Sequence, residues 1–461
     1  MKKSAFSIVV LISFFFLIPT GTVRAQELDP QLLHLIEQAK IKSSVIKINN
    51  LTANQARLDR KIAKSTFIPN ISLNGSYTRL NEDIEFDENL QTLLHGTEKL
   101  LIKEAIGIPF NTPLPASIPT TEIEPLLDKD VLKSSVDMEW VLFSGFKVSN
   151  AVKATSHKQK ALNYANDIEG NNIIINLADT YDKLGLVLAS EKVIQSSEVY
   201  LNEQEKFVNA AIKNGLATPI DKQRIILARH KLASKRIEIE NNKELLFALL
   251  QKLTDEDLNH LRALSPNLNP LQVDLNLEDS KRSELLALDE AIKASKYLEK
   301  YEKNSYIPTI AAKGKYEILK DDLSLLDPQW YVGVGFKWSI FDGGAALQKA
   351  KKASVNTRKY EAQLHEAKDL IQLGETKALL EYQTEHKKVE MAIQEVELTK
   401  QVYNLVSKQY QNGLATIAEY LDSLNDLEAS QFSLQQAYYN QRRAGINLLQ
   451  AKGLLQNLVN N

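Results

Sequence analysis

Two hydrophobic patterns alternate along the chain. In four short stretches apolar and polar residues alternate position by position, which is typical of β-strands with one apolar face. Those stretches lie at residues 70–78, 136–142, 309–316 and 330–340. Elsewhere apolar residues recur every three or four positions, which predicts α-helices. The longest such run, residues 146–213, has no proline in 68 positions and as one helix would measure about 100 Å.

The whole pattern occurs twice. Gly145 and Gly215 in the first half correspond to Gly343 and Gly413 in the second, at an offset of 198. The Ile-Pro-x-Ile motif at 68–71 recurs at 307–310, at an offset of 239. The first half therefore carries 41 additional residues (239 − 198) between its two strands. The sequence predicts a duplicated unit of strand, strand, very long helix, turn and return helix.

The N-terminus is predicted to be a signal peptide, residues 1–25. Lys2 and Lys3 precede an apolar run that ends near Ile18, and small residues stand before Gln26. The alternative is a membrane anchor. The apolar run holds about 14 residues, whereas a spanning helix needs about 20. Export with cleavage is therefore the favoured interpretation.

The mature chain divides into segments that follow the repeat. In the first half we predict a helix at 26–65, whose pattern runs from 29 to 64. Two strands follow within 66–145, on either side of a long loop at 78–135. Residues 146–253 then form a long helix, a turn (214–218) and a return helix (219–253). Five prolines make the long loop irregular, with room for one short helix near 90–106. In the second half we predict a mixed α/β equatorial segment at 254–283, a helix at 284–304, two strands within 305–342, and a long helix, turn (412–416) and return helix (417–458) within 343–461.

Charge and composition exclude several functions. The chain has 56 basic and 58 acidic residues, and removal of the three basic residues of the signal peptide leaves a net charge of about −5. This balance argues against nucleic-acid binding. The absence of cysteine excludes disulfides and thiolate metal sites. The seven histidines are scattered without ligand spacing, and no glycine-rich phosphate loop occurs, so we expect no enzymatic activity, no cofactor and no metal.

Four strands leave the assembly incomplete. About eight strands are the fewest that close a membrane barrel, so the chain is expected to pool its strands with copies of itself. A soluble β-sandwich is an alternative, but strands separated by very long helices cannot build its core. A rod-like coiled coil is another. It explains the heptad-spaced Val389, Val396, Tyr403 and Tyr410 but not the strands.

These features together resemble the TolC family of outer-membrane efflux and secretion channels. The residues that carry the resemblance are Trp140, Phe143, Gly145, Trp338, Phe341, Asp342, Gly343, Gly344 and the turns around Gly215 and Gly413. The resemblance implies an α+β membrane protein. Its homotrimer would form one 12-stranded barrel in outer-membrane lipid, continued by an antiparallel α-helical tunnel across the periplasm. It also implies docking to an inner-membrane RND or ABC transporter through a periplasmic adaptor (membrane fusion) protein.

Two transport roles are compatible with this resemblance. The first is a passive exit duct of a tripartite efflux system that carries small toxic molecules to the exterior. The alternative is the outer-membrane channel of a type I protein secretion system, or of polysaccharide secretion. Neither role needs a catalytic residue.

The resemblance also assigns a periplasmic entrance. Residues matching Glu419 and Asp422 line it in the family, and a residue matching Asp221 latches it with a tyrosine matching Tyr410. Glu419, Asp422 and Asp426 are spaced to share one helix face. The alternative is a solvated acidic face. A latch arginine of some family members is replaced here by Ala415, so a charged latch is not expected.

Overall fold

The structure is a computed structural model and describes residues 28–115, 117–119, 123–276, 280–319 and 328–460. The predicted signal peptide lies outside the described residues. Two compact units can be distinguished. The first comprises Met1–Lys47, Asn166–Ser283 and Lys368–Asn461, and the second comprises Ile48–Ala165 and Glu284–Ala367. The two long helices, α4 (Lys147–Lys213) and α8 (Ala345–Gln411), contribute to both units.

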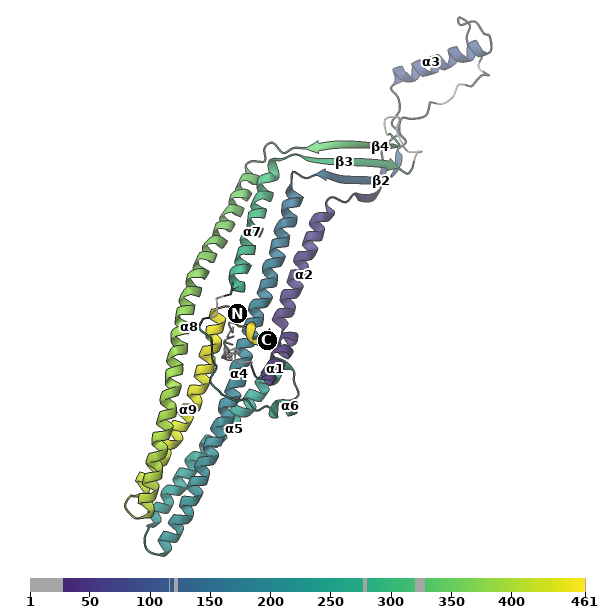
Figure 1. Cartoon of the computed structure of the whole chain (residues 1–461). Helices are drawn as coiled ribbons and strands as arrows, with labels where there is room; N and C mark the ends of the chain where they lie inside the picture. Colours follow the sequence, from purple (N-terminus) through teal and green to yellow (C-terminus); the bar gives the residue numbers. More distant parts are fainter. Residues whose placement is uncertain (1–27, 116, 120–122, 277–279, 320–327, 461) are drawn as a thin grey trace, which may run out of the picture. The chain divides into compact units, whose positions relative to one another are not determined.

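The second unit contains one four-stranded antiparallel sheet. Its strands are β1 (Asn70–Arg79), β2 (Asp130–Phe143), β3 (Thr309–Glu317) and β4 (Trp330–Lys337), in the order β1-β2-β3-β4. Figure 1 shows β2, β3 and β4 side by side. Within the described residues, the outer edges of β1 and β4 have no strand partner. The four predicted strands are confirmed.

The register separates the sheet into an apolar and a polar face. One row across all four strands consists of Ile71, Met138, Gly314 and Val332. The next row, which points to the opposite face because side chains alternate, consists of Asn70, Glu139, Lys313 and Gly333. The apolar side chains are not covered, since Val332 and Val334 are about 70% exposed. The sheet therefore presents bare hydrocarbon on one side and charge on the other.

Each half uses its tryptophan in the same way. The Trp140 indole N–H donates a hydrogen bond to the Phe67 carbonyl at 2.9 Å, and the Trp338 indole N–H donates to the Tyr306 carbonyl at the same distance. Both acceptors lie just before the Ile-Pro motif that precedes a strand. The duplicated sequence therefore produces a duplicated tertiary contact.

The fourth strand is shorter than predicted. The alternation that runs to Ile340 predicts pairing to that point, but the strand ends at Lys337. Beyond it the backbone turns toward the next helix, where the Asp342 carboxylate accepts hydrogen bonds from the N–H groups of Gly344 (3.1 Å) and Ala346 (2.8 Å). The apolar alternation continues through this turn to Ile340 and therefore did not reveal it. The turn is formed by the hydrogen bonds of the Asp342 cap.

The strands β1 and β2 are longer than predicted. Pairing continues to Arg79 opposite Asp130, so the connecting loop covers residues 80–129 instead of 78–135. The short helix predicted in this loop is confirmed as α3 (Glu88–Ala105).

The helices of the second unit are joined by polar contacts as well as by small buried apolar residues such as Ala56, Ala154 and Ala294. They are α2 (Ser44–Ser65), α7 (Ser283–Lys303), the short 3-10 helix η1 (Asn304–Tyr306) and the first parts of α4 and α8. The His157 Nδ1 of α4 lies 2.7 Å from the Glu290 carboxylate of α7, and Ser295 and Thr357 are joined by a hydroxyl pair at 3.0 Å.

The first unit is helical and has two main cores. It contains α1 (Pro30–Lys42), α5 (Pro219–Thr254), α6 (Leu258–Arg262), α9 (Ile417–Ala451), α10 (Asn457–Asn460) and the later parts of α4 and α8. One core gathers Leu32, Leu35, Ile36, Leu177, Tyr181, Leu250 and Leu261. The other gathers Ile194, Leu201, Val208, Ile225, Tyr403, Tyr420 and Leu424. Among the helices that the structure describes, none is long and apolar enough to cross a lipid bilayer.

Two helix boundaries differ from the prediction. The helix predicted at 29–64 is interrupted at Ser43, whose backbone leaves the helical conformation and separates α1 from α2. The second return helix ends at Ala451 instead of Leu458, because Gly453 adopts a positive φ of 73° and the Leu454 N–H closes onto the Leu449 carbonyl at 2.8 Å.

The equatorial segment is not mixed α/β as predicted. The described residues of 254–283 contain the five-residue α6 and no strand. The backbone N–H and carbonyl of Leu271 both bond to the Gln441 side chain of α9, each at 2.8 Å, and the Val273 N–H donates to the Tyr382 hydroxyl at 3.1 Å. Alternating leucines here pack against helices, and helix side chains replace strand partners.

A buried ion pair joins this segment to two helices. The Arg442 guanidinium of α9 lies 3.0 Å from the Asp182 carboxylate of α4, and both side chains are less than a tenth exposed. Arg442 also donates to the Asn269 carbonyl at 2.9 Å. Burial raises the pKa of Asp182, and the charge of Arg442 opposes that rise. Removing Arg442 would therefore leave the Asp182 carboxylate buried without a compensating charge, which costs folding free energy.

We predict that Arg442→Met destabilises the folded chain by about 3 to 5 kcal/mol, because it leaves a buried carboxylate unpaired. Adding Asp182→Asn should restore most of the loss. The measurement is the midpoint of urea unfolding in detergent. The neighbouring Arg443→Met is the matched control, since the Arg443 side chain is 60% exposed and should change stability by no more than about 0.5 kcal/mol. Equal losses in the two single variants would contradict the assignment.

Candidate functional site: the two inter-helix turns

Both long helices end in the same backbone turn. In the first, Gly215 has a φ of +71° and the Leu216 N–H bonds to the carbonyl five residues earlier at 2.8 Å. Gly413 and Leu414 repeat this geometry, with a φ of +72° and a bond of 2.8 Å. This pattern is a Schellman turn, which favours glycine at the left-handed position. The two predicted turn glycines have this role.

A reciprocal cap starts each return helix. The Asp221 carboxylate accepts the Thr218 N–H at 2.8 Å, and the Glu419 carboxylate accepts the Thr416 N–H at 2.7 Å. These hydrogen bonds, from backbone and hydroxyl of Thr416, hold the pKa of Glu419 below its usual range. Two of the predicted entrance carboxylates are thus helix caps, and Glu419 is ionised at neutral pH.

Tyr410 lies partly buried beside these turns. Its ring packs against Phe207 and Tyr420, each with centroids 5.8 Å apart. Burial raises the pKa of Tyr410, and the negative charge of Asp221 raises it further. Among the described residues the Asp221 carboxylate accepts its hydrogen bonds from Thr218, and none from Tyr410. The two residues are near each other, and the latch itself stays a prediction.

A tyrosine pair lies deeper in the same core. The hydroxyls of Tyr403 and Tyr420 are 3.0 Å apart and buried, and Tyr200 packs on Tyr403 with centroids 5.0 Å apart. Sequence analysis placed Tyr403 on a helix seam but missed Tyr420. Its position three residues before the buried Ser423 and four before Leu424 on α9 is the signal that it belongs to the apolar face.

The acidic face of α9 is exposed. Glu419, Asp422 and Asp426 are all solvent-accessible. Asp422 and Asp426 also line a groove of about 750 Å³ between α5 and α9, together with Arg224 and Lys231. The acidic face therefore has basic neighbours on α5 that sequence reasoning did not identify.

The glycines at the strand-to-helix junctions have different reasons to be glycine. A Cβ on Gly145 would lie 2.9 Å from the Ile307 Cβ, so close packing and a φ of +62° both require glycine there. At Gly343 and Gly344 close packing gives no such reason, because a Cβ there would meet nothing within 4 Å. Their φ values of +70° and +81° explain them instead.

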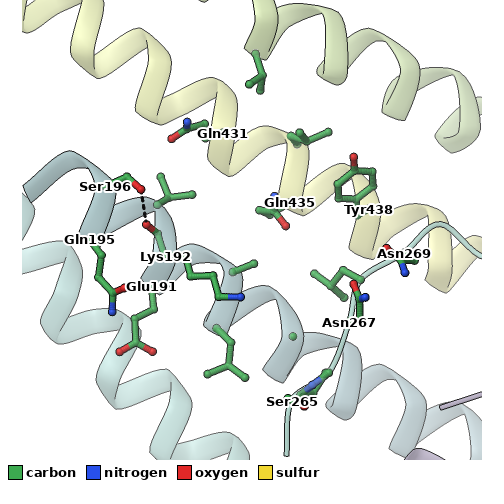
Figure 2. Close-up of a pocket in the computed structure, with 18 residues that line it drawn as sticks. Glu191, Lys192, Gln195, Ser196, Ser265, Asn267, Asn269, Gln431, Gln435 and Tyr438 are labelled. Atoms are coloured by element: carbon green, nitrogen blue, oxygen red, sulfur yellow. Dashed lines mark hydrogen bonds between the residues drawn. The ribbon is translucent and has the colours of Figure 1, made fainter. Parts of the chain in front are cut away.

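A second groove, of about 900 Å³, lies between α4, α9 and the segment around Asn267. Figure 2 shows Gln435 and Tyr438 of α9 on one side of it and Lys192 of α4 on the other. Its neighbouring Glu191 is paired with Lys243 at 3.0 Å. The lining combines amides and hydroxyls with a larger share of aliphatic carbon, and among its described residues no nucleophile is paired to a base.

Comparison with known proteins agrees with this architecture. Residues 276–454 match the family described as outer membrane efflux protein. No curated protein matches the chain in sequence. Three solved structures share the fold over almost the whole chain: the outer membrane protein VceC of Vibrio cholerae (TM-score 0.71, 16% identity, 93% of this chain and 97% of that one), the CmeC outer membrane channel of Campylobacter jejuni (0.70, 17%, 93% and 86%) and the MtrE outer membrane channel of Neisseria gonorrhoeae in its open state (0.69, 14%, 92% and 90%).

The chain therefore has the TolC-like fold of outer membrane efflux proteins, with four antiparallel strands and long antiparallel helices. The resemblance and the fold class predicted from the sequence are confirmed at this level, and the outer-membrane location stays a prediction.

Proposed function

We propose that the chain is one subunit of a passive exit duct, which carries small toxic molecules across the outer membrane. An inner-membrane pump of the RND or ABC type would supply them through a periplasmic adaptor protein. The observation that carries this proposal is the sheet, with its bare apolar face, its charged opposite face and its two open edges.

The sheet needs further strands in order to enter lipid. Backbone groups on the open edges of β1 and β4 would each lose several kcal/mol in hydrocarbon if unpaired, so a membrane sheet must close on itself. Four strands cannot close, whereas three copies would supply 12. This arithmetic, together with the fold, supports a homotrimer whose apolar face contacts lipid and whose charged face lines the lumen.

The long helices carry an apolar surface that one chain does not cover. On α8 a stripe of large side chains, each more than half exposed, follows spacings of seven and eleven residues: Leu373, Leu380, Met391, Leu398 and Leu405. Such spacing is typical of a coiled-coil seam. A neighbouring subunit in a trimer would bury it, which supports a tunnel wall built from several chains.

Efflux is favoured over secretion of protein or polysaccharide. The matched family is described as efflux proteins, and the structures with the same fold include channels. The polar lining expected of the lumen suits a duct for water-borne solutes without a binding site of high specificity.

The function is tested by a pair of substitutions on opposite faces of β4. Val334→Arg puts a charge on the apolar face and should cost about 2 to 4 kcal/mol near the bilayer midplane, so it should abolish trimer assembly and channel activity. Lys337→Ser, on the charged face, is the matched control and should assemble as the wild type does. Assembly is measured by native electrophoresis in detergent and activity by planar-bilayer conductance. A conducting Val334→Arg channel would refute the proposal.

A latch at the turns is the proposed closing device. Tyr410 of one helix pair would bond to Asp221 of the neighbouring pair and hold the inner end narrow. We predict that Tyr410→Phe with Asp221→Ala raises single-channel conductance. Because Asp221→Ala also removes a helix cap, Tyr410→Phe alone provides the clean comparison, and Tyr438→Phe on α9 controls for loss of a hydroxyl. Unchanged conductance in both latch variants would count against a gate here.

The entrance is proposed to select cations. Three chains would place six carboxylates from Glu419 and Asp422 around the opening, and their mutual repulsion favours cations, divalent ions most strongly. Basic residues on α5 reduce this field, and salt screens it. We predict that Glu419→Ala with Asp422→Ala lowers cation selectivity, measured as the reversal potential in a bilayer. The same double variant should also lose block by divalent or trivalent metal, measured as the decrease in current when the metal is added. Glu390→Ala with Glu397→Ala, two exposed carboxylates of α8, is the charge-matched control. The same selectivity in both double variants would show that the acidic face is only solvated.

A further inference from the structure

Three side chains from two distant parts of the chain converge in the first unit. They are His34 of α1, Glu256 in the link after α5, and His260 of α6. Their ligand atoms all lie within 4.8 Å of one another. The His34 Nε2 is 2.8 Å from one oxygen of Glu256, and the His260 Nδ1 is 3.1 Å from the other. Sequence analysis found no ligand spacing among the histidines, because 222 residues separate His34 from Glu256.

The backbones that carry these groups are firmly placed. His34 stands between Leu32 and Leu35, and His260 precedes Leu261, and all three leucines are fully buried in the same core. Arg262 of α6 is also paired with Glu244 of α5 at 2.9 Å. The three ligand-bearing segments are therefore anchored before any ion binds, which reduces the entropy that binding must overcome.

The link that presents Glu256 adopts an uncommon conformation. Asp255 has a φ of +66°, one of two positive values at non-glycine residues in the described chain. It ends α5 in the left-handed region, which costs free energy for a residue with a Cβ. Its carboxylate is paired with Lys42 of α1 at 2.5 Å. This turn directs Glu256 toward the two imidazoles instead of letting the helix continue.

We propose that His34, Glu256 and His260 form a site for a divalent transition metal, with Zn²⁺ the preferred ion. Two imidazoles and one carboxylate are a common donor set for zinc, which leaves a fourth position for water. Ligands at about 2.0 to 2.1 Å in a tetrahedron lie roughly 3.4 Å from each other. The present separations, from 2.8 Å to at most 4.8 Å, need changes of no more than about 1.4 Å to reach this distance. The ion takes the place of the protons that now join the carboxylate to the rings.

The chemistry separates this site from sites for harder cations. Imidazole nitrogens suit Zn²⁺, Cu²⁺ and Ni²⁺, whereas Mg²⁺ and Ca²⁺ prefer oxygen ligands. Both histidines are about half exposed, with side-chain exposures of 46% and 53%, so an ion can enter from solvent. Bound metal would clip α1 to the link between α5 and α6, a cross-link that a chain without cysteine cannot make by a disulfide.

Zinc binding by the full-length chain tests the site. The protein is purified in detergent without a histidine tag, stripped with chelator, and titrated with ZnCl₂ in a calorimeter. We expect one Zn²⁺ per chain, no competition from excess Mg²⁺, and a zinc-dependent rise in the thermal unfolding midpoint. X-ray absorption should show histidine ligands at about 2.0 Å.

Single substitutions identify the ligands. His34→Ala and His260→Ala should each weaken binding at least about tenfold, since each removes one of three protein ligands, and Glu256→Gln should do so while keeping the shape of the side chain. His230→Ala, at an exposed position on α5, is the matched control and should bind as the wild type does. Circular dichroism checks that each variant is folded. Absence of bound zinc, or equal affinity in wild type and His34→Ala, would show that the cluster is a hydrogen-bonded surface network only.

Discussion

The unpaired backbone at the two edges of the sheet is the constraint on which the rest of the structure depends. The outer strands β1 and β4 each leave one row of N–H and carbonyl groups without a strand partner in the described chain. In water such edges invite association, and in lipid they must be paired. The sheet also carries bare valine and isoleucine on one face and paired lysine and glutamate on the other. One chain satisfies neither requirement, and this is the reason for proposing that the chain is a subunit of a larger barrel.

Because the sequence is duplicated, the helical part contains the same turn and the same helix cap twice. Each half ends its long helix in a glycine turn and starts the return helix with a threonine and an acidic residue. The acidic residue thereby has two possible roles, since Asp221 and Glu419 stabilise a helix start and also place a charge at a turn. Because the cap needs a carboxylate or amide at that position in any case, the presence of acid there is weak evidence for a gate. Asp422 and Asp426, which cap nothing, are the more informative charges.

The middle of the first unit shows how tertiary contacts replace regular structure. Gln441 satisfies both backbone groups of Leu271, and Arg442 reaches both Asp182 and the Asn269 carbonyl. Two adjacent residues of α9 thus hold an irregular segment against α4 and α9. The same region brings His34 to Glu256 and His260. Buried polar side chains of the helices make the hydrogen bonds to backbone groups that a neighbouring strand would otherwise make.

The sequence alone determined the repeat, the four strands, the long helices and the turns, because each depends on local periodicity or on a glycine and its cap. It also determined which strand face is apolar, since alternation needs no knowledge of the partner. Only the tertiary structure decided where β4 stops, that residues 254–276 form no strand, and that Gly343 is required by its backbone angle and not by packing. It alone brought Arg224 and Lys231 beside the acidic face and joined His34 to His260. The end of β4 depends on the local cap at Asp342. The other features depend on contacts between residues tens to hundreds of positions apart, or on backbone angles set by the fold, and hydrophobic periodicity carries no information on any of them.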